Sequence, residues 1–126
     1  MAMLVDAKGF ERKQFLPGEI ILQEGTIGTR AYLVETGTVE ISRGYGEKRR
    51  VLGRVGPGGI FGELALIDGQ GRSADAKAMT ETTCLVIPQD IFRDKLDRTD
   101  PFIRALIRIM CRNLRSMTER AVEREG

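Results

Sequence analysis

The stretch FGELALIDGQGRSA spans residues 61–74 and joins a glycine-led apolar run to a return segment that ends on an arginine and a serine. Residues 62–66 can begin a short helix, and the free backbone N–H groups at a helix start favour an anion. The glycines within residues 69–71 let the chain curl back. We therefore expect Arg72 and Ser73 to lie beside the start of this helix.

The side chains of this stretch suit a ligand with two kinds of polar group. An arginine presents a fork of N–H donors that matches phosphate oxygens, and a serine hydroxyl adds another donor. A phosphate would repel Glu63, so this carboxylate is expected to accept hydrogen bonds from a hydroxyl-rich part of the same ligand. One anion and one sugar together describe a nucleotide. The alternative is that Glu63 and Arg72 pair with each other across a turn, and the residues alone leave both open.

Upstream and downstream of this stretch, from about residue 11 to residue 88, short β-prone runs alternate with glycine-rich turns. Strands at such spacing predict an antiparallel, jelly-roll-like β-roll. Residues 38–43 and 48–55 flank Gly44-Tyr45-Gly46 and are expected to form a hairpin. The clearest strand candidates are residues 19–22, 31–34, 38–42, 50–52 and 83–87.

After Pro88 the apolar residues change to a helical period. Residues 89–96 predict a short helix, and Thr99-Asp100-Pro101 is a helix-start signal for a long helix over about residues 101–123. This long helix carries apolar residues at heptad spacing, which is typical of a coiled-coil dimer, although a helix packed on its own β-roll explains the same pattern. The heptad positions are Ile103, Ile107, Met110, Leu114, Met117 and Ala121.

The composition of the 126 residues excludes several classes of protein. At 41% hydrophobic and 30% charged the chain is neither disordered nor membrane-spanning. It has no histidine and two cysteines, so metal sites and the common catalytic bases are disfavoured. A net charge of +2 and the absence of tryptophan do not favour nucleic-acid binding. The N-terminus lacks the apolar stretch of a signal peptide, so we expect a cytoplasmic, non-enzymatic protein.

Residues 61–78, FGELALIDGQGRSADAKA, closely resemble the phosphate-binding cassette of the cyclic nucleotide-binding domain family. The resemblance extends over about residues 11–119, through FLPGEII at 15–21 and YLVETGTVEI at 32–41. It implies one domain over residues 1–126: a β-roll at about 11–88 that contains the cassette, then C-terminal helices at about 89–123. It also implies that the last helix acts as a lid over the ligand.

The resemblance assigns a role to individual residues of the cassette. It implies that Glu63 accepts a hydrogen bond from the ribose 2′-hydroxyl, Arg72 pairs with the cyclic phosphate, and Ser73 donates to the phosphate. Backbone N–H groups near Gly62, Leu64 and Ala74 are expected to complete the cradle. The positions expected to contact the purine are Leu22, Ile41 and Leu52 in the β-roll and Arg115 and Thr118 in the lid helix, although ordinary core or helix-surface roles remain open for all five.

The resemblance therefore implies a non-catalytic sensor whose lid helix moves when a cyclic nucleotide binds. A serine directly after Arg72 favours cAMP over cGMP. No metal or other cofactor is expected. The expected partners are the nucleotide and a second copy of the chain, which pairs through the C-terminal helix, with no direct contact to nucleic acid or membrane. The alternatives are the sensor fragment of a Crp-type transcriptional regulator that lacks its DNA-binding domain, or a non-binding interaction or assembly domain of the same fold.

Overall fold

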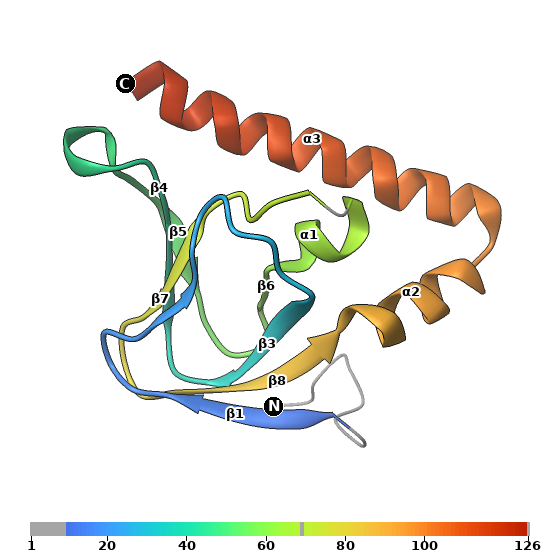
Figure 1. The fold of residues 1–126 in the computed structure, drawn as a ribbon, viewed down its shortest axis with the longest axis horizontal. Coiled ribbons are helices and arrows are strands. Elements are labelled where there is room, and N and C mark those ends of the chain that lie inside the picture. The colour runs from blue at the N-terminus through green and yellow to red at the C-terminus, as the bar shows by residue number, and fades with distance from the viewer. Residues whose placement is uncertain (1–9, 69, 126) are drawn as a thin grey trace.

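The computed structural model describes residues 10–68 and 70–125, apart from the side chains of residues 65, 68 and 118–125. Two four-stranded antiparallel sheets form a β-roll, and three helices lie along one side of it (Figure 1). The first sheet has the order β1 (Glu11–Phe15), β8 (Thr82–Pro88), β3 (Arg30–Thr36) and β6 (Ile60–Phe61). The second has the order β2 (Ile20–Leu22), β7 (Asp75–Ala78), β4 (Val39–Arg43) and β5 (Arg50–Val55). The predicted β-roll with C-terminal helices is confirmed.

The central strands β3 and β8 are buried on both faces, which explains why their sequences are continuous apolar runs rather than alternating ones. Tyr32 and Val34 of β3 point into the core between the two sheets, together with the β8 residues Cys84 and Val86. The intervening side chains of both strands form a second core on the helical side of the first sheet: Ala31, Leu33, Leu85 and Ile87, with Leu66. The first sheet therefore packs against the second sheet on one face and, through Leu66, against part of the helical layer on the other.

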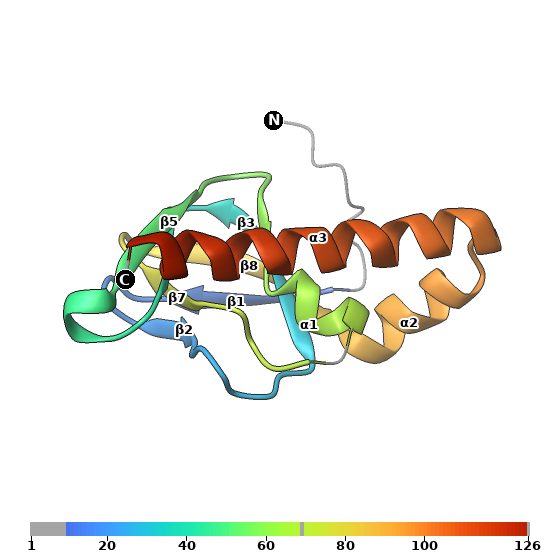
Figure 2. The same cartoon turned by 90° about the horizontal axis from the view of Figure 1, so that it is seen from above.

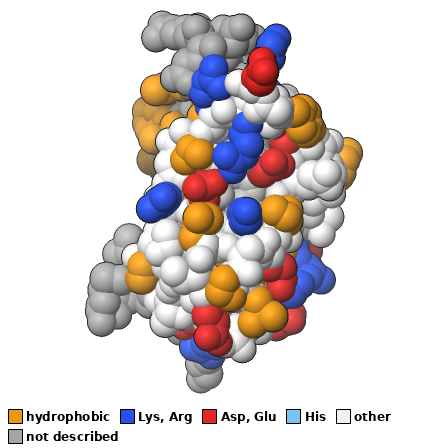
Figure 3. Space-filling model, turned by 90° about the vertical axis from the view of Figure 1, so that its left-hand side faces the viewer, with side chains coloured by type: hydrophobic (Ala, Val, Ile, Leu, Met, Phe, Trp, Pro, Cys, Tyr) orange, Lys and Arg blue, Asp and Glu red, His pale blue; other side chains and the backbone are white. Residues whose placement is uncertain are grey.

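The β4–β5 hairpin forms where the sequence predicts it. Residue pairs from Val39↔Val55 to Arg43↔Arg50 hold the two strands together, with a bulge between Ile41 and Ser42. The turn contains the short 3-10 helix η1 (Gly46–Lys48). This hairpin lies at the end of the roll that faces the viewer in Figure 3, where acidic, basic and apolar side chains are intermixed.

The three helices are α1 (Glu63–Asp68), α2 (Gln89–Asp97) and α3 (Pro101–Glu125). The backbone N–H of Phe102 donates to the Asp100 carboxylate at 2.8 Å, so Asp100 caps the start of α3 as its sequence predicts. Helix α3 then runs across the roll, against α1 and β5 (Figure 2). No helix in the described part of the chain has the length and apolar character needed to cross a bilayer.

Most of the apolar heptad of α3 does not pack on the β-roll. Met110, Leu114 and Met117 are 55%, 50% and 63% exposed, and Ile103 is 43% exposed. Cys111, on the side of the helix that faces α1, is 2% exposed. The helix thus docks through one narrow strip and leaves a broad apolar face open.

Candidate functional site

A cavity of about 190 Å³ lies between the start of α1, the return segment that follows α1, strand β5 and helix α3. All six residues predicted to hold the phosphate and ribose line this cavity: Gly62, Glu63, Leu64, Arg72, Ser73 and Ala74. These residues come from two short segments, which the fold brings face to face. The fold thus places all six residues around one cavity, while their ligand contacts stay predictions.

Arg72 is the most buried charged side chain of the site, at 7% exposed. Its Nη1 donates to the carbonyl oxygen of Gly62 at 3.0 Å, and its Nη2 donates to the carbonyl oxygen of Arg30 at 2.7 Å. Burial lowers the pKa of the Arg72 guanidinium, but an arginine remains protonated near neutral pH. A charged guanidinium is thus held in the cavity wall by two uncharged carbonyl oxygens.

Two glycines provide the space that Arg72 occupies. A Cβ atom on Gly28 would overlap the Arg72 guanidinium, so only glycine fits at this position with Arg72 where it is. Gly62 has φ +81°, a conformation that glycine adopts without strain, and a Cβ there would lie 3.1 Å from Nη1 of Arg72. The glycines therefore fix the position of the arginine as well as the path of the backbone.

Glu63 is the first residue of α1 and is half-buried in the cavity wall. Burial raises the pKa of its carboxyl group, and its own backbone N–H acts in the opposite direction. Among the described ion pairs none joins Glu63 to Arg72, so the pairing considered as an alternative is not formed. The carboxylate and the guanidinium instead line one cavity as separate polar groups.

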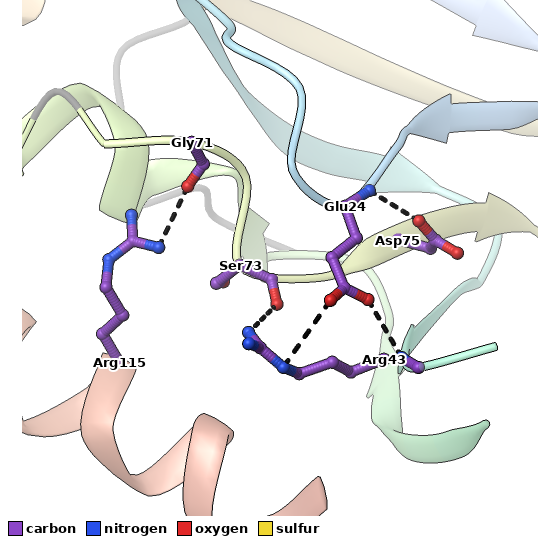
Figure 4. Close-up of polar contacts among 7 residues, drawn as sticks. Glu24, Arg43, Gly71, Ser73, Asp75 and Arg115 are labelled. Atoms are coloured by element: carbon purple, nitrogen blue, oxygen red, sulfur yellow. Dashed lines mark hydrogen bonds and ion pairs between the residues drawn. The ribbon is translucent and has the colours of Figure 1, made fainter. Parts of the chain in front are cut away.

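The return segment of the cassette is held by the loop between β2 and β3. The N–H of Gly25 donates to the carbonyl oxygen of Arg72 at 2.9 Å, and the N–H of Arg72 donates to Thr26 at 2.8 Å. On its other side Arg43 donates to the Ser73 carbonyl oxygen (Figure 4). The backbone at Arg72 and Ser73 is thus fixed from two directions.

Only some of the residues predicted to contact the purine line the cavity. Ile41 and Leu52 line the cavity. Leu22 is 9% exposed and belongs to the core between the sheets rather than to the cavity wall. Arg115 points at the cassette, where its Nη1 donates to the carbonyl oxygen of Gly71 at 3.0 Å. The side chain of Thr118 lies outside the described residues.

Several lining residues were not predicted from the sequence. Leu114 was identified only as a heptad position, and it closes the cavity from the side of α3. Val55 reaches the wall together with Leu52 because strand β5 is bulged against β4, and a bulge has no clear signal in the sequence. The remaining lining residues directly flank residues 62–64 and 72–74: Ile60, Phe61, Asp75 and Ala76.

The described residues contain no group of three or more His, Cys, Asp or Glu side chains that could hold a metal ion. Cys84 is buried among apolar residues, and burial raises the pKa of its thiol to about 11. A thiol in such surroundings is a core side chain rather than a nucleophile. The ionisable side chains that line the cavity are those of Glu63, Arg72 and Asp75.

Two known proteins resemble this chain over most of its length. The chain is 33% identical over 107 residues to the cyclic AMP receptor protein of Thermus thermophilus, covering 84% of this chain and 50% of that protein. It is 29% identical over 109 residues to a CRP-like cAMP-activated global transcriptional regulator of Mycobacterium tuberculosis, covering 86% of this chain and 49% of the regulator. The chain thus spans about half the length of these relatives.

Solved structures show the same arrangement of strands and helices. The cAMP-bound form of the EAL enzyme Bd1971 superposes with a TM-score of 0.83 at 29% identity, covering 88% of this chain and 30% of that one. The catabolite activator protein of Thermus thermophilus superposes with a TM-score of 0.70 at 29% identity, covering 93% of this chain and 54% of that one. The model of the cyclic nucleotide-binding domain family matches residues 12–99. Given that match and the cassette geometry, the chain belongs to the cyclic nucleotide-binding domain family, as its sequence predicts.

Proposed function

We propose that this protein is a non-catalytic sensor that binds a 3′,5′-cyclic nucleotide in the cavity beside Arg72. The observation that carries the proposal is that a buried, charged guanidinium and a separate carboxylate, Glu63, line one cavity. The guanidinium has five N–H donors and is held by two carbonyl oxygens, so an incoming phosphate can accept charge-assisted hydrogen bonds from it. Glu63 then accepts from the ribose 2′-hydroxyl.

Backbone N–H groups at Gly62, Leu64 and Ala74, with the Ser73 hydroxyl, complete the proposed phosphate cradle. Ile41 and Leu52 line the cavity beyond the cassette and would contact the purine. We propose cAMP as the preferred ligand over cGMP, because the two sequence relatives are a cyclic AMP receptor protein and a cAMP-activated regulator. Ser73 itself lies between the threonine that helps to bind guanine and the alanine that accompanies adenine in related cassettes. No metal is needed, since a cyclic phosphate carries a single negative charge that one arginine and several N–H donors can balance.

The size of the cavity supports a movement of α3. Pockets for small ligands have volumes of about 300–1,000 Å³, whereas this cavity has about 190 Å³ with Leu114 of α3 in its wall. We propose that α3 shifts when a nucleotide binds, and that this shift is the output of the sensor. A ligand shifts the equilibrium between the two positions of α3 only if it binds the chain more tightly in one of them. Each tenfold difference in affinity supplies about 1.4 kcal/mol.

We further propose that two copies of the chain pair through α3. The exposed residues Met110, Leu114 and Met117 continue one apolar stripe at heptad spacing, and a second copy of the same helix would cover it. Because Leu114 belongs both to this stripe and to the cavity wall, the ligand would alter the dimer geometry. This mechanism involves only the β-roll and α3, so it applies equally if the chain is the sensor of a Crp-type regulator.

Isothermal titration calorimetry with cAMP and cGMP tests the proposal, after bound nucleotide has been removed by unfolding and refolding. We expect saturable binding that Arg72→Ala weakens tenfold or more, about 1.4 kcal/mol. Arg54→Ala, which removes an exposed arginine from β5, is the matched control and should bind as the unaltered chain does. Absence of heat and of a thermal shift with both nucleotides would overturn the sensor and leave an interaction or assembly domain of the same fold.

A further inference from the structure

Arg43, the last residue of β4, holds the cassette from outside the cavity. Its Nη1 donates to the carbonyl oxygen of Ser73 at 2.6 Å (Figure 4). Arg43 itself does not line the cavity, and its side chain is 21% exposed. A half-buried arginine from β4 therefore fixes the Ser73–Ala74 peptide unit of the cassette.

Arg43 is in turn held by a carboxylate. Oε2 of Glu24 lies 3.8 Å from Nε of Arg43, and Oε1 of Glu24 accepts from the N–H of Gly44 at 2.9 Å. The N–H of Glu24 donates to Oδ1 of Asp75 at 2.6 Å. We call Glu24, Arg43 and Asp75 the cassette brace. It joins the β2–β3 loop, the β4–β5 hairpin and the return segment of the cassette, which are far apart in the sequence.

The orientation of one peptide unit links this brace to the ligand. The described residues contain no cis peptide bond, so the carbonyl of Ser73 and the N–H of Ala74 point in opposite directions. Arg43 holds the carbonyl on its own side, which turns the N–H of Ala74 away from Arg43. Ser73 and Ala74 both line the cavity.

We propose that Arg43 is a positioning residue for ligand binding: it holds the Ser73–Ala74 peptide so that the Ala74 N–H is directed at the ligand's phosphate. The proposal rests on the proposed function. A fixed N–H donor contributes more to the binding free energy than a mobile one, because no conformational entropy is lost in ordering it when the ligand binds. Arg43 acts through the backbone of the cassette and needs no contact with the nucleotide.

Arg43 also has an electrostatic effect that must be separated from positioning. Its charge offsets the carboxylate of Glu24, which would otherwise repel an anion bound nearby. Loss of Arg43 alone therefore combines a disordered peptide with an unpaired carboxylate. The double variant Glu24→Gln with Arg43→Met removes the carboxylate as well, and leaves only the loss of positioning.

The hairpin offers a matched control for Arg43. Arg49 follows the same turn, forms an ion pair of 2.7 Å with Glu40 and does not touch the cassette. Calorimetry with the cyclic nucleotide should show affinity weakened about tenfold by Arg43→Met and less than twofold by Arg49→Met. The double variant should remain at least fivefold weaker than the unaltered chain. Arg43→Lys keeps the charge without the fork, so it should bind with intermediate affinity.

If Arg43 had a purely structural role, its loss would leave the ligand-induced shift of the Ala74 amide signal unchanged. Nuclear magnetic resonance therefore distinguishes that role from positioning. In the unaltered chain the amide signal of Ala74 and the 31P signal of the nucleotide should shift on binding, and Arg43→Met should abolish most of the Ala74 shift. Thermal unfolding of each ligand-free variant shows whether the fold is intact. If Arg43→Met is unfolded, the affinity of Arg43→Lys tests the positioning role in its place. Equal affinities of the Arg43 and Arg49 variants, or full recovery in the double variant, would overturn the positioning role while leaving the sensor intact. If the unaltered chain does not bind the nucleotide, the proposed sensor function itself is overturned.

Discussion

Arg115 of α3 donates a hydrogen bond of 3.0 Å to the carbonyl oxygen of Gly71, the residue directly before Arg72. One helical turn earlier, Cys111 is 2% exposed, and its Sγ lies 3.8 Å from the carbonyl oxygen of Leu64 in α1. Helix α3 is thus fixed to both segments of the cassette, the start of α1 and the return segment. In the proposed mechanism, a change in the cassette would reach α3 through these two contacts.

We expect Arg115→Gln to loosen α3 without unfolding the β-roll. A partly exposed hydrogen bond contributes about 1 kcal/mol, so hydrogen–deuterium exchange of the α3 amides should speed up about fivefold. Arg112→Gln is the control, because Arg112 is exposed on the same helix. Equal exchange rates in the two variants would show that the contact with Gly71 does not hold the helix.

We expect Gly28→Ala to weaken binding of the cyclic nucleotide at least tenfold, although Gly28 is not expected to touch the ligand. A Cβ there would overlap the Arg72 guanidinium and force it out of its place in the cavity wall. Calorimetry measures the affinity and thermal unfolding reports on the fold. Gly53→Ala, where a Cβ meets no atom within 4 Å, should have no effect. An unchanged affinity of Gly28→Ala would mean that the ligand itself repositions Arg72.

We expect the cost of burying Glu63 to appear as a pH dependence of stability. Burial raises its pKa, so the folded chain binds the proton more tightly than the unfolded chain does. The contribution of Glu63 to the free energy of unfolding is fully present at low pH. It is lost as the pH rises from about 4.3, the ordinary glutamate pKa, through the raised pKa of Glu63 in the folded chain. Glu63→Gln carries no charge, so at pH 7 its melting temperature should exceed that of the unaltered chain.

This stability difference should shrink between pH 7 and pH 4, and calorimetry of the same variant should show weaker nucleotide binding. The exposed Glu47 provides the control substitution Glu47→Gln, which should melt in parallel with the unaltered chain at every pH. A constant difference for Glu63→Gln over the whole range would contradict the assignment, because a packing effect does not titrate.

We expect Met110→Glu to convert a dimer into a monomer. Met110 is 55% exposed in the middle of the apolar stripe, and a carboxylate buried there between two helices would be unpaired. Light scattering should show half the mass for this variant. Arg108→Gln changes the net charge by the same amount at an exposed position outside the heptad and should leave the mass unaltered. A monomeric unaltered chain, with and without cyclic nucleotide, would exclude pairing through α3.

The local elements could be predicted because local rules determine them. The alternation of glycine turns with β-prone runs predicted the β-roll, and the change of period after Pro88 predicted α2 and α3. The spacing of Glu63 and Arg72 around two glycines predicted that both would belong to one site, and the fold places both on one cavity wall. Each of these predictions concerns residues close together in the chain, where backbone geometry leaves few alternatives.

The partners across the fold could not be predicted in this way. Arg72 is held by the carbonyl oxygen of Arg30, 42 residues away, and Arg43 reaches Ser73 from a distance of 30 residues. Leu22 and Ile41 both occur in apolar strand patterns, yet only Ile41 lines the cavity. The sequence by itself determined the strands, the helices and the cassette, whereas the pairing register and the bulge of β4 against β5 decided which side chains meet around the ligand site. Those features depend on how the two sheets pack, which no local pattern encodes.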